Sequence, residues 1–179
     1  MIKKIFIIGL LLLSVSYVKA QMVAIKSDIV KDVAMIPSLG TDIVVGEKHT
    51  IGLNLYGCTK PWGKDLTIMA ISPEFRYWFS GRPFTRHFIG FSAQMANYDI
   101  HWNKKIYEGN SVAMGVAMGY TLNLSKRLNL ELLTGLNVLG FKQKEYYEGD
   151  RYDYYGSRTN SDGIMLVPRI EASISYIIR

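Results

Sequence analysis

The sequence predicts an all-β fold, an eight-stranded antiparallel up-and-down transmembrane β-barrel. Segments of about ten residues alternate between apolar and polar or small side chains, which is typical of outer-membrane strands. Short and long connections alternate between these segments. After the N-terminal leader, no apolar run approaches the ~20 residues of a helical span. Because only helices and closed barrels satisfy every backbone hydrogen bond in lipid, a membrane-spanning chain with this pattern has to form a closed barrel.

The N-terminus has the pattern of a secretory signal peptide. Lys3 and Lys4 give a basic start, Ile5 to Val15 form an apolar run, and Val18-Lys19-Ala20 offers small residues for cleavage. That run is too short for a transmembrane helix. We expect residues 1–20 to be removed after Ala20, and residues 21–179 to form one barrel domain in a bacterial outer membrane.

Composition excludes several classes of protein. Loss of the leader removes three lysines and lowers the formal charge from +6 to +3, which is too little for a nucleic-acid surface. The single cysteine, Cys58, cannot form an intrachain disulfide and lies too far from the leader to carry a lipid anchor. The chain also shows no metal-ligand spacing. We therefore expect no cofactor, no metal and no nucleic-acid partner.

Eight segments carry the period-two alternation. The clearest is 128–139, in which Leu128, Leu130 and Leu132 alternate with Asn129 and Glu131. The first three segments are less regular but alternate well enough to be predicted as strands. In chain order the predicted strands are 23–30, 39–45, 50–57, 68–79, 88–98, 111–124, 128–139 and 166–178.

The connections predict which end of the barrel faces outward. Short links at 46–49, 80–87 and 125–127 have the length of periplasmic turns. The connections at 57–67, 99–110 and 140–162 are mostly longer, as outer loops are. The first outer connection, 31–37, is a short exception.

Three stretches carry a resemblance to a known family. They are Pro37-Ser38-Leu39-Gly40, Pro73-Glu74-Phe75-Arg76-Tyr77-Trp78-Phe79 and Lys126-Arg127-Leu128-Asn129-Leu130-Glu131. On these motifs nearly the whole mature chain resembles an uncharacterised domain-of-unknown-function family of small outer-membrane barrels from Bacteroides-type bacteria. The resemblance implies an eight-stranded barrel, more distantly similar to the membrane domain of OmpA, and implies no known activity.

The polar strand faces place a set of charged side chains inside the predicted barrel. Eight strands enclose a space just wide enough for their own side chains. Charges removed from water cost several kcal/mol each unless they are paired. We expect one connected structural network, with a narrow ion path or a catalytic carboxylate pair as the open alternatives. The network residues are Lys26, Asp28, Asp42, Glu74, Arg76, Glu131, Arg169 and Glu171.

Aromatic residues in the outer loops are candidates for binding. Tyrosine and tryptophan offer large contact area with few rotatable bonds, which favours recognition of a surface protein, a glycan or a lipopolysaccharide headgroup. The alternative that we favour is that the last two strands extend beyond the bilayer as a hairpin with tyrosines paired across it. The candidates are Trp62, Trp102, Tyr146, Tyr147, Tyr152, Tyr154 and Tyr155.

Two functional hypotheses follow. The first is a structural or surface-interaction protein, acting in binding or adhesion, whose barrel anchors its loops among outer-membrane lipid and lipopolysaccharide. The second is an enzyme that modifies outer-leaflet lipid, for which His101 beside Asp99 is the one histidine in a predicted outer loop. A lone loop histidine is usually solvated surface, so we expect no catalytic residues and favour the first hypothesis.

Overall fold

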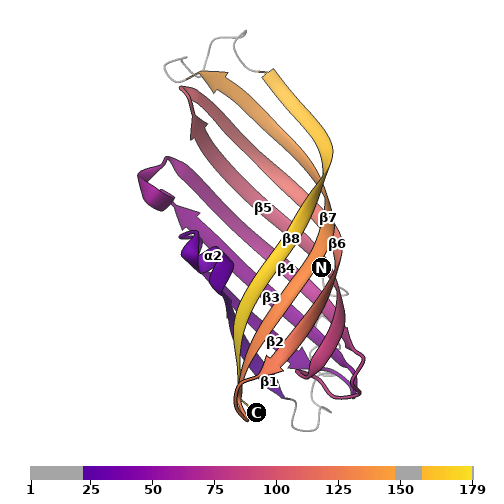
Figure 1. Cartoon of the computed structure of the whole chain (residues 1–179). Helices are drawn as coiled ribbons and strands as arrows, with labels where there is room; N and C mark the ends of the chain where they lie inside the picture. The colour runs from indigo at the N-terminus through magenta and orange to yellow at the C-terminus, as the bar shows by residue number, and fades with distance from the viewer. Residues whose placement is uncertain (1–21, 148–158, 179) are drawn as a thin grey trace, which may run out of the picture.

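The computed structural model describes residues 22–147 and 159–178, which form a single antiparallel sheet with two short helical turns (Figure 1). The expected leader lies outside the described residues, as do Tyr152, Tyr154 and Tyr155. Within the described ranges, no helix has the length and apolarity required to cross a membrane.

Eight strands pair in chain order, and the first also pairs with the last, so the sheet closes on itself. The prediction of an all-β fold with eight antiparallel strands is therefore confirmed. Two short helices, α2 (Ile29–Val33) and η2 (Pro61–Gly63), lie in connections. The strands are β1 (Val23–Asp28), β2 (Ser38–Val44), β3 (His49–Thr59), β4 (Leu66–Trp78), β5 (Arg86–Trp102), β6 (Lys105–Asn123), β7 (Leu128–Tyr147) and β8 (Thr159–Ile177).

The register of the ring fixes its stagger. Ala24 on β1 has a directly paired partner on β2, which in turn has one on β3, and so on around the ring. This series of partners ends at Val167 on β8. The partner of Ala24 across the closing seam is Ile177, ten residues further along β8. A stagger of this kind requires tilted strands, typically at ~35–45° to the axis, as Figure 1 shows. Eight strands in this arrangement leave an interior that side chains can fill.

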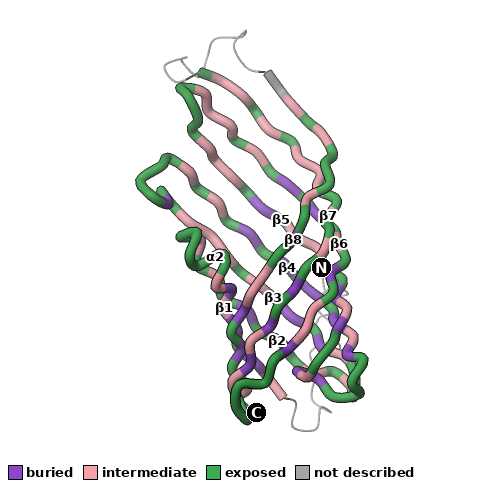
Figure 2. Tube along the Cα trace, viewed as in Figure 1, coloured by how far each residue is buried: buried purple, intermediate pink, exposed green. Residues whose placement is uncertain are grey.

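Side chains alternate across the sheet, as the strand period of two requires. The inward positions of the lower part of the ring are mainly buried polar or charged groups, such as Asp42, Thr50 and Ser175. Figure 2 shows the buried positions concentrated there, whereas the upper ends of β5 to β8 are more exposed. Large apolar residues point outward and are exposed, including Phe91, Met114, Met118, Leu136 and Ile170.

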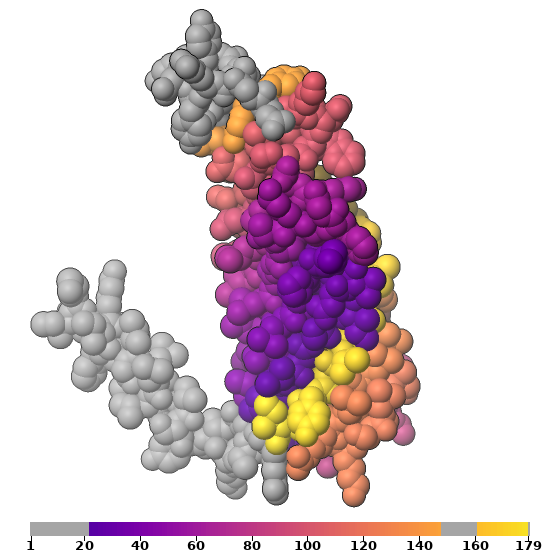
Figure 3. All heavy atoms as spheres, turned by 90° about the vertical axis from the view of Figure 1, so that its left-hand side faces the viewer, coloured from indigo at the N-terminus to yellow at the C-terminus, as the bar shows by residue number. Residues whose placement is uncertain are grey.

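The expected strand over residues 23–30 is too long, because β1 ends at Asp28. The Asp28 carboxylate accepts a hydrogen bond from the backbone N–H of Val30 (3.0 Å) and so caps α2. An aspartate in this role satisfies a donor at the helix start and favours helix over strand immediately after it. The β1–α2 segment then lies against β8 (Figure 3).

The expected outer loop over 99–110 is largely strand, and so are the described residues of the one over 140–162. Asn103 and Lys104 both have positive φ (52° and 63°), which suits the tight two-residue turn between β5 and β6. Strand β7 continues to Tyr147, and β8 begins at Thr159. Strands β5 to β8 have 17 to 20 residues and β1 to β3 only 6 to 11, so one wall is taller than the other. The described part of the last hairpin thus has the extended form that we favoured.

A proline lies in the middle of β4, where a backbone donor is normally needed. Even-numbered residues of β4 bond to β3, as the Trp78 N–H does to the Lys48 carbonyl, so the missing N–H of Pro73 faces β5. The Ser72 hydroxyl donates to the Ala93 carbonyl on β5 (3.0 Å). This side chain compensates for the missing backbone donor and keeps the ring closed across Pro73.

Three aromatic side chains fill the interior at the end of the ring where β1 begins, β8 ends and the short turns lie. Trp78, Phe84 and Phe88 are each at most 1% exposed. The ring centroids lie 4.7 Å apart for Trp78 and Phe88 and 5.7 Å apart for Trp78 and Phe84. The Trp78 indole N–H donates to the Thr50 hydroxyl (3.1 Å). We call Trp78, Phe84 and Phe88 the aromatic plug; the sequence analysis did not predict it.

The aromatic plug predicts a stability effect. We expect Trp78→Ala to lower the free energy of unfolding by about 3–5 kcal/mol, because it leaves a cavity between two buried rings. Urea titration of the lipid-reconstituted protein, followed by circular dichroism, measures the change. Trp62→Ala is the matched control, since Trp62 is 69% exposed and its removal should change stability little. Equal effects of the two variants would contradict the plug.

Candidate functional site

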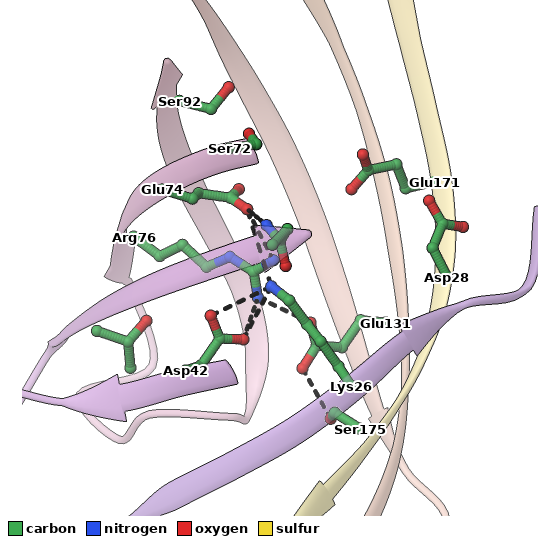
Figure 4. Close-up of polar contacts among 12 residues, drawn as sticks. Lys26, Asp28, Asp42, Ser72, Glu74, Arg76, Ser92, Glu131, Glu171 and Ser175 are labelled. Atoms are coloured by element: carbon green, nitrogen blue, oxygen red, sulfur yellow. Dashed lines mark hydrogen bonds and ion pairs between the residues drawn. The ribbon is translucent and has the colours of Figure 1, made fainter. Parts of the chain in front are cut away.

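The middle of the interior holds the charged side chains that the strand pattern placed inside. They come from β1, β2, β4, β7 and β8, and Figure 4 shows Lys26, Asp42, Glu74 and Glu131 gathered around Arg76. All eight predicted residues form hydrogen bonds or ion pairs with one another or with close neighbours. The set, which we call the charged layer, consists of Lys26, Asp28, Asp42, Glu74, Arg76, Glu131, Arg169 and Glu171.

Arg76 is the centre of the charged layer. Its Nη1 donates to Glu131 Oε2 at 2.8 Å and to Asp42 Oδ2 at 3.4 Å. Its Nη2 donates to Glu74 Oε2 at 3.2 Å. The planar guanidinium suits several carboxylates at once, because its donors are fixed in a fork. The same group lies 4.7 Å from the centroid of the Phe88 ring, so the layer rests directly on the aromatic plug.

A second cluster forms around Arg169 on β8. Its Nε and Nη2 donate to the two oxygens of Glu171 at 3.0 and 2.9 Å, and its Nη1 donates to the Ser92 hydroxyl at 2.8 Å. Paired contacts of this kind combine charge with fixed geometry. Glu74 Oε2 accepts from both Arg169 (3.3 Å) and Arg76 (3.2 Å). Glu74 therefore joins the two clusters into one network.

Lys31 is a fourth interior cation that sequence analysis missed. The sequence placed it in an outer connection, but α2 turns it toward β8, where its Nζ contacts Glu171 Oε1 at 2.6 Å. It also pairs with Asp28, three residues earlier. An aspartate and a lysine three residues apart predict an ion pair in a helix. The alternating pattern over 23–30 predicted a strand there, so the sequence did not predict this pair. With Lys31 included, four cations face five carboxylates, so charge is nearly balanced.

The charged layer is tightly filled. A side chain at Gly52 would collide with Asp42, and one at Gly90 would come within 2.7 Å of Glu74 Oε1, so these glycines make room for the carboxylates. The hollow beside Lys26 and Lys31 measures only about 10 Å³, roughly the least that can hold one water. The geometry supports a structural network over an ion path through this level.

Of the loop candidates, the structure describes Trp62, Trp102, Tyr146 and Tyr147. Trp62 and Trp102 are 69% and 63% exposed, and Lys64 Nζ lies 5.7 Å from the centroid of the Trp102 ring. Tyr147 is 60% exposed and pairs with Lys105 across β6 and β7, next to the partly buried Tyr146. Within the described residues, these exposed aromatics lie at the end of the ring opposite the aromatic plug.

Two polar pairs lie at the end of the ring opposite the aromatic plug. Lys105 Nζ lies 2.5 Å from Glu145 Oε2, and this hydrogen bond raises the pKa of Lys105 and lowers the pKa of Glu145. His101 Nε2 lies 3.3 Å from Asp99 Oδ1, and both side chains are exposed. In the described part of the chain, no group of three or more potential ligands could hold a metal ion.

A closed ring of eight antiparallel strands around a charged, filled interior defines the class of this protein. The chain belongs to the family described as "Protein of unknown function (DUF3575)", whose model matches residues 5–178. The prediction of an uncharacterised family is therefore confirmed. No curated protein matches the chain.

The charged layer predicts a strong response to loss of its centre. We expect Arg76→Met to lower the free energy of unfolding by about 3–5 kcal/mol, because three carboxylates lose their shared cation while remaining buried. Adding Glu131→Gln to that variant should recover part of the loss. Urea titration in lipid measures both effects. Lys60→Met is the control, since its pair with Asp65 is exposed and should contribute nothing measurable; a loss as large as that of Arg76→Met would contradict the central role.

Proposed function

We propose that the chain is an exported outer-membrane β-barrel, cleaved after its leader, that anchors outward-facing hairpins in lipid. It then acts as a structural or surface-interaction protein through the outer ends of these hairpins. The observation that carries the proposal is the polarity of the two faces: charges point into the ring and large apolar side chains point out of it. A soluble protein of this size would bury the apolar face instead.

The outward face changes polarity in one step along four neighbouring strands. One row of directly paired residues is apolar or small and consists of Met95, Val112, Gly140 and Ile164. Two positions further along each strand, the corresponding row is entirely polar and consists of Asn97, Asn110, Lys142 and Asp162. A shared boundary of this kind supports a border between hydrocarbon and water at the outer side.

The outward apolar face, which includes Phe91, Met114, Met118, Leu136 and Ile170, is called the apolar belt. Aromatic and imidazole rings lie at its other end. Tyr77 packs edge-on against Phe79 with centroids 5.4 Å apart, and His87 packs against Tyr120 at 4.7 Å. Amphipathic rings prefer the headgroup level of a bilayer. Together with the polar row, these contacts support a belt bounded on both sides, as an inserted barrel requires.

The interior supports an anchoring role more than transport. The aromatic plug closes one end, and the charged layer fills the level above it. What remains available to partners is the outer end, where Trp62, Trp102 and Tyr147 expose most of their rings. Rigid aromatic side chains of this kind favour contact surfaces for protein or glycan.

Membrane insertion predicts a depth-dependent response to charge. We expect Leu136→Arg to destabilise the inserted protein by about 2–4 kcal/mol, because Leu136 points outward in the middle of the belt. Asn110→Arg, in the polar row, should cost about 0–1 kcal/mol. Urea titration in phosphatidylcholine vesicles measures both. A freely soluble protein with no loss of stability in Leu136→Arg would refute the proposed insertion.

The surface-interaction role predicts a separable defect. We expect the triple variant Trp62→Ser, Trp102→Ser, Tyr147→Ser to lose the partners that chemical crosslinking detects on intact cells, while the amount of inserted protein stays unchanged. Removal of residues 144–158 should have the same effect. Met95→Ser, on the lipid-facing wall, is the control and should retain the partners. Crosslinking identical to that of wild type in both outer-end variants would exclude the role.

A further inference from the structure

A cavity lies inside the ring above the charged layer. It has a volume of about 440 Å³, within the ~300–1,000 Å³ range of small-molecule sites. Inward side chains from β3 to β8 line it, so it lies on the inner face of the ring. The residues that decide its chemistry are Ile68, Ala96, Leu139, Phe141, Gln143 and Met165.

The wall of this cavity is mainly apolar. Aliphatic and aromatic side chains from five strands line it, including Ile68, Leu139 and Phe141. The Tyr98 hydroxyl donates to Gln143 Oε1 at 2.9 Å, so these two polar groups largely satisfy each other. The charged groups of the layer below are engaged in ion pairs. Such a wall suits an uncharged hydrocarbon better than a polar solute.

The ring is open beside this cavity. Strand β1 pairs with β8 only as far as Asp28 with Ser173, whereas β7 accompanies β8 up to Thr159. In residues 22–147 and 159–178, no strand pairs with the other edge of β8 before Ser173. Helix α2 covers the first part of this edge, where Lys31 contacts Glu171. Met165 points inward yet is 47% exposed, as expected at the mouth of the cavity.

The open edge lies within the apolar belt. Odd-numbered residues of β8 bond to β7, as the Ile177 N–H does to the Arg127 carbonyl, so even-numbered ones turn their backbone groups to the opening. Pro168 is one of these and contributes no N–H there, which suits a free edge. Ile164 and Ile170, on the outer face of the same edge, are 81% and 70% exposed. The opening therefore faces hydrocarbon in the proposed membrane.

We infer that this cavity binds the hydrocarbon chain of an amphiphile, which enters from the outer leaflet between β8 and the end of β3. The inference rests on the proposed membrane insertion. The hydrocarbon chain can belong to a free fatty acid or to a membrane lipid, because the cavity would contact only the hydrocarbon that both molecules contain. Tyr56 on β3 and Met165 on β8 line the cavity on the two sides of this entrance.

Photocrosslinking in phosphatidylcholine vesicles tests the inference. One arm uses a fatty acid with a diazirine in its chain, and the other a phosphatidylcholine with the same group in an acyl chain. We expect crosslinks at inward Leu139 and Met165 in addition to outward Leu136 and Val138, mapped by mass spectrometry. Crosslinks in the first arm alone identify a free fatty acid, and crosslinks in the second identify a lipid acyl chain; either supports the inference.

Blocking variants make the test specific. Ala96→Trp fills the cavity, and Met165→Trp narrows its mouth at an already exposed position. Each should reduce inward crosslinking at least tenfold and leave outward crosslinking unchanged, whereas Met95→Trp on the outer wall should change neither inward site. Outward crosslinks without inward ones in wild type overturn the inference but leave insertion intact. Absence of both, with protein recovered outside the vesicles, refutes the proposed insertion.

Discussion

The pairing of β1 with β8 is the constraint on which the structure depends. Only five residue pairs, from Ala24 with Ile177 to Asp28 with Ser173, close the ring. Closure gives every strand of the lower half two neighbours, so its backbone groups are satisfied without water, as hydrocarbon would require. Closure with a ten-residue stagger also sets the width of the interior, and that width decides which side chains fit inside.

The ion pairs of the charged layer allow only one register of the strands in the closed ring. A shift of one residue would exchange the two faces of a strand. For β4 it would move Glu74 and Arg76 to the outer wall and bring Phe75 inside. Because Glu74 contacts cations from β1 and β8, and Arg76 contacts carboxylates from β2 and β7, such a shift would break pairs with four strands at once. Buried ion pairs do not guarantee net stability, but here their geometry defines one arrangement of the strands.

Period-two alternation is local, so the sequence predicted the eight strands and which charged residues share a face. It could not predict what depends on competing local bonds or on register. Asp28 caps a helix in place of continuing a strand, and this brings in Lys31. Phe84 folds into the ring from a turn at positive φ. Leu139 and Met165 are paired neighbours on β7 and β8, and Ile68 lines one cavity with them only because the stagger brings β4 to the same level.

The unequal strand lengths connect the fold to the opening. Strand β1 has 6 residues and β8 has 19, so a sheet that closes at one end leaves an edge of β8 without a strand beside it in the described chain. Unpaired backbone groups at hydrocarbon depth cost several kcal/mol each. Helix α2 covers part of this edge, and Pro168 removes one donor from it. Chains tolerate such a local violation where it has a function, and the function that we infer for this edge is an entrance to the apolar cavity.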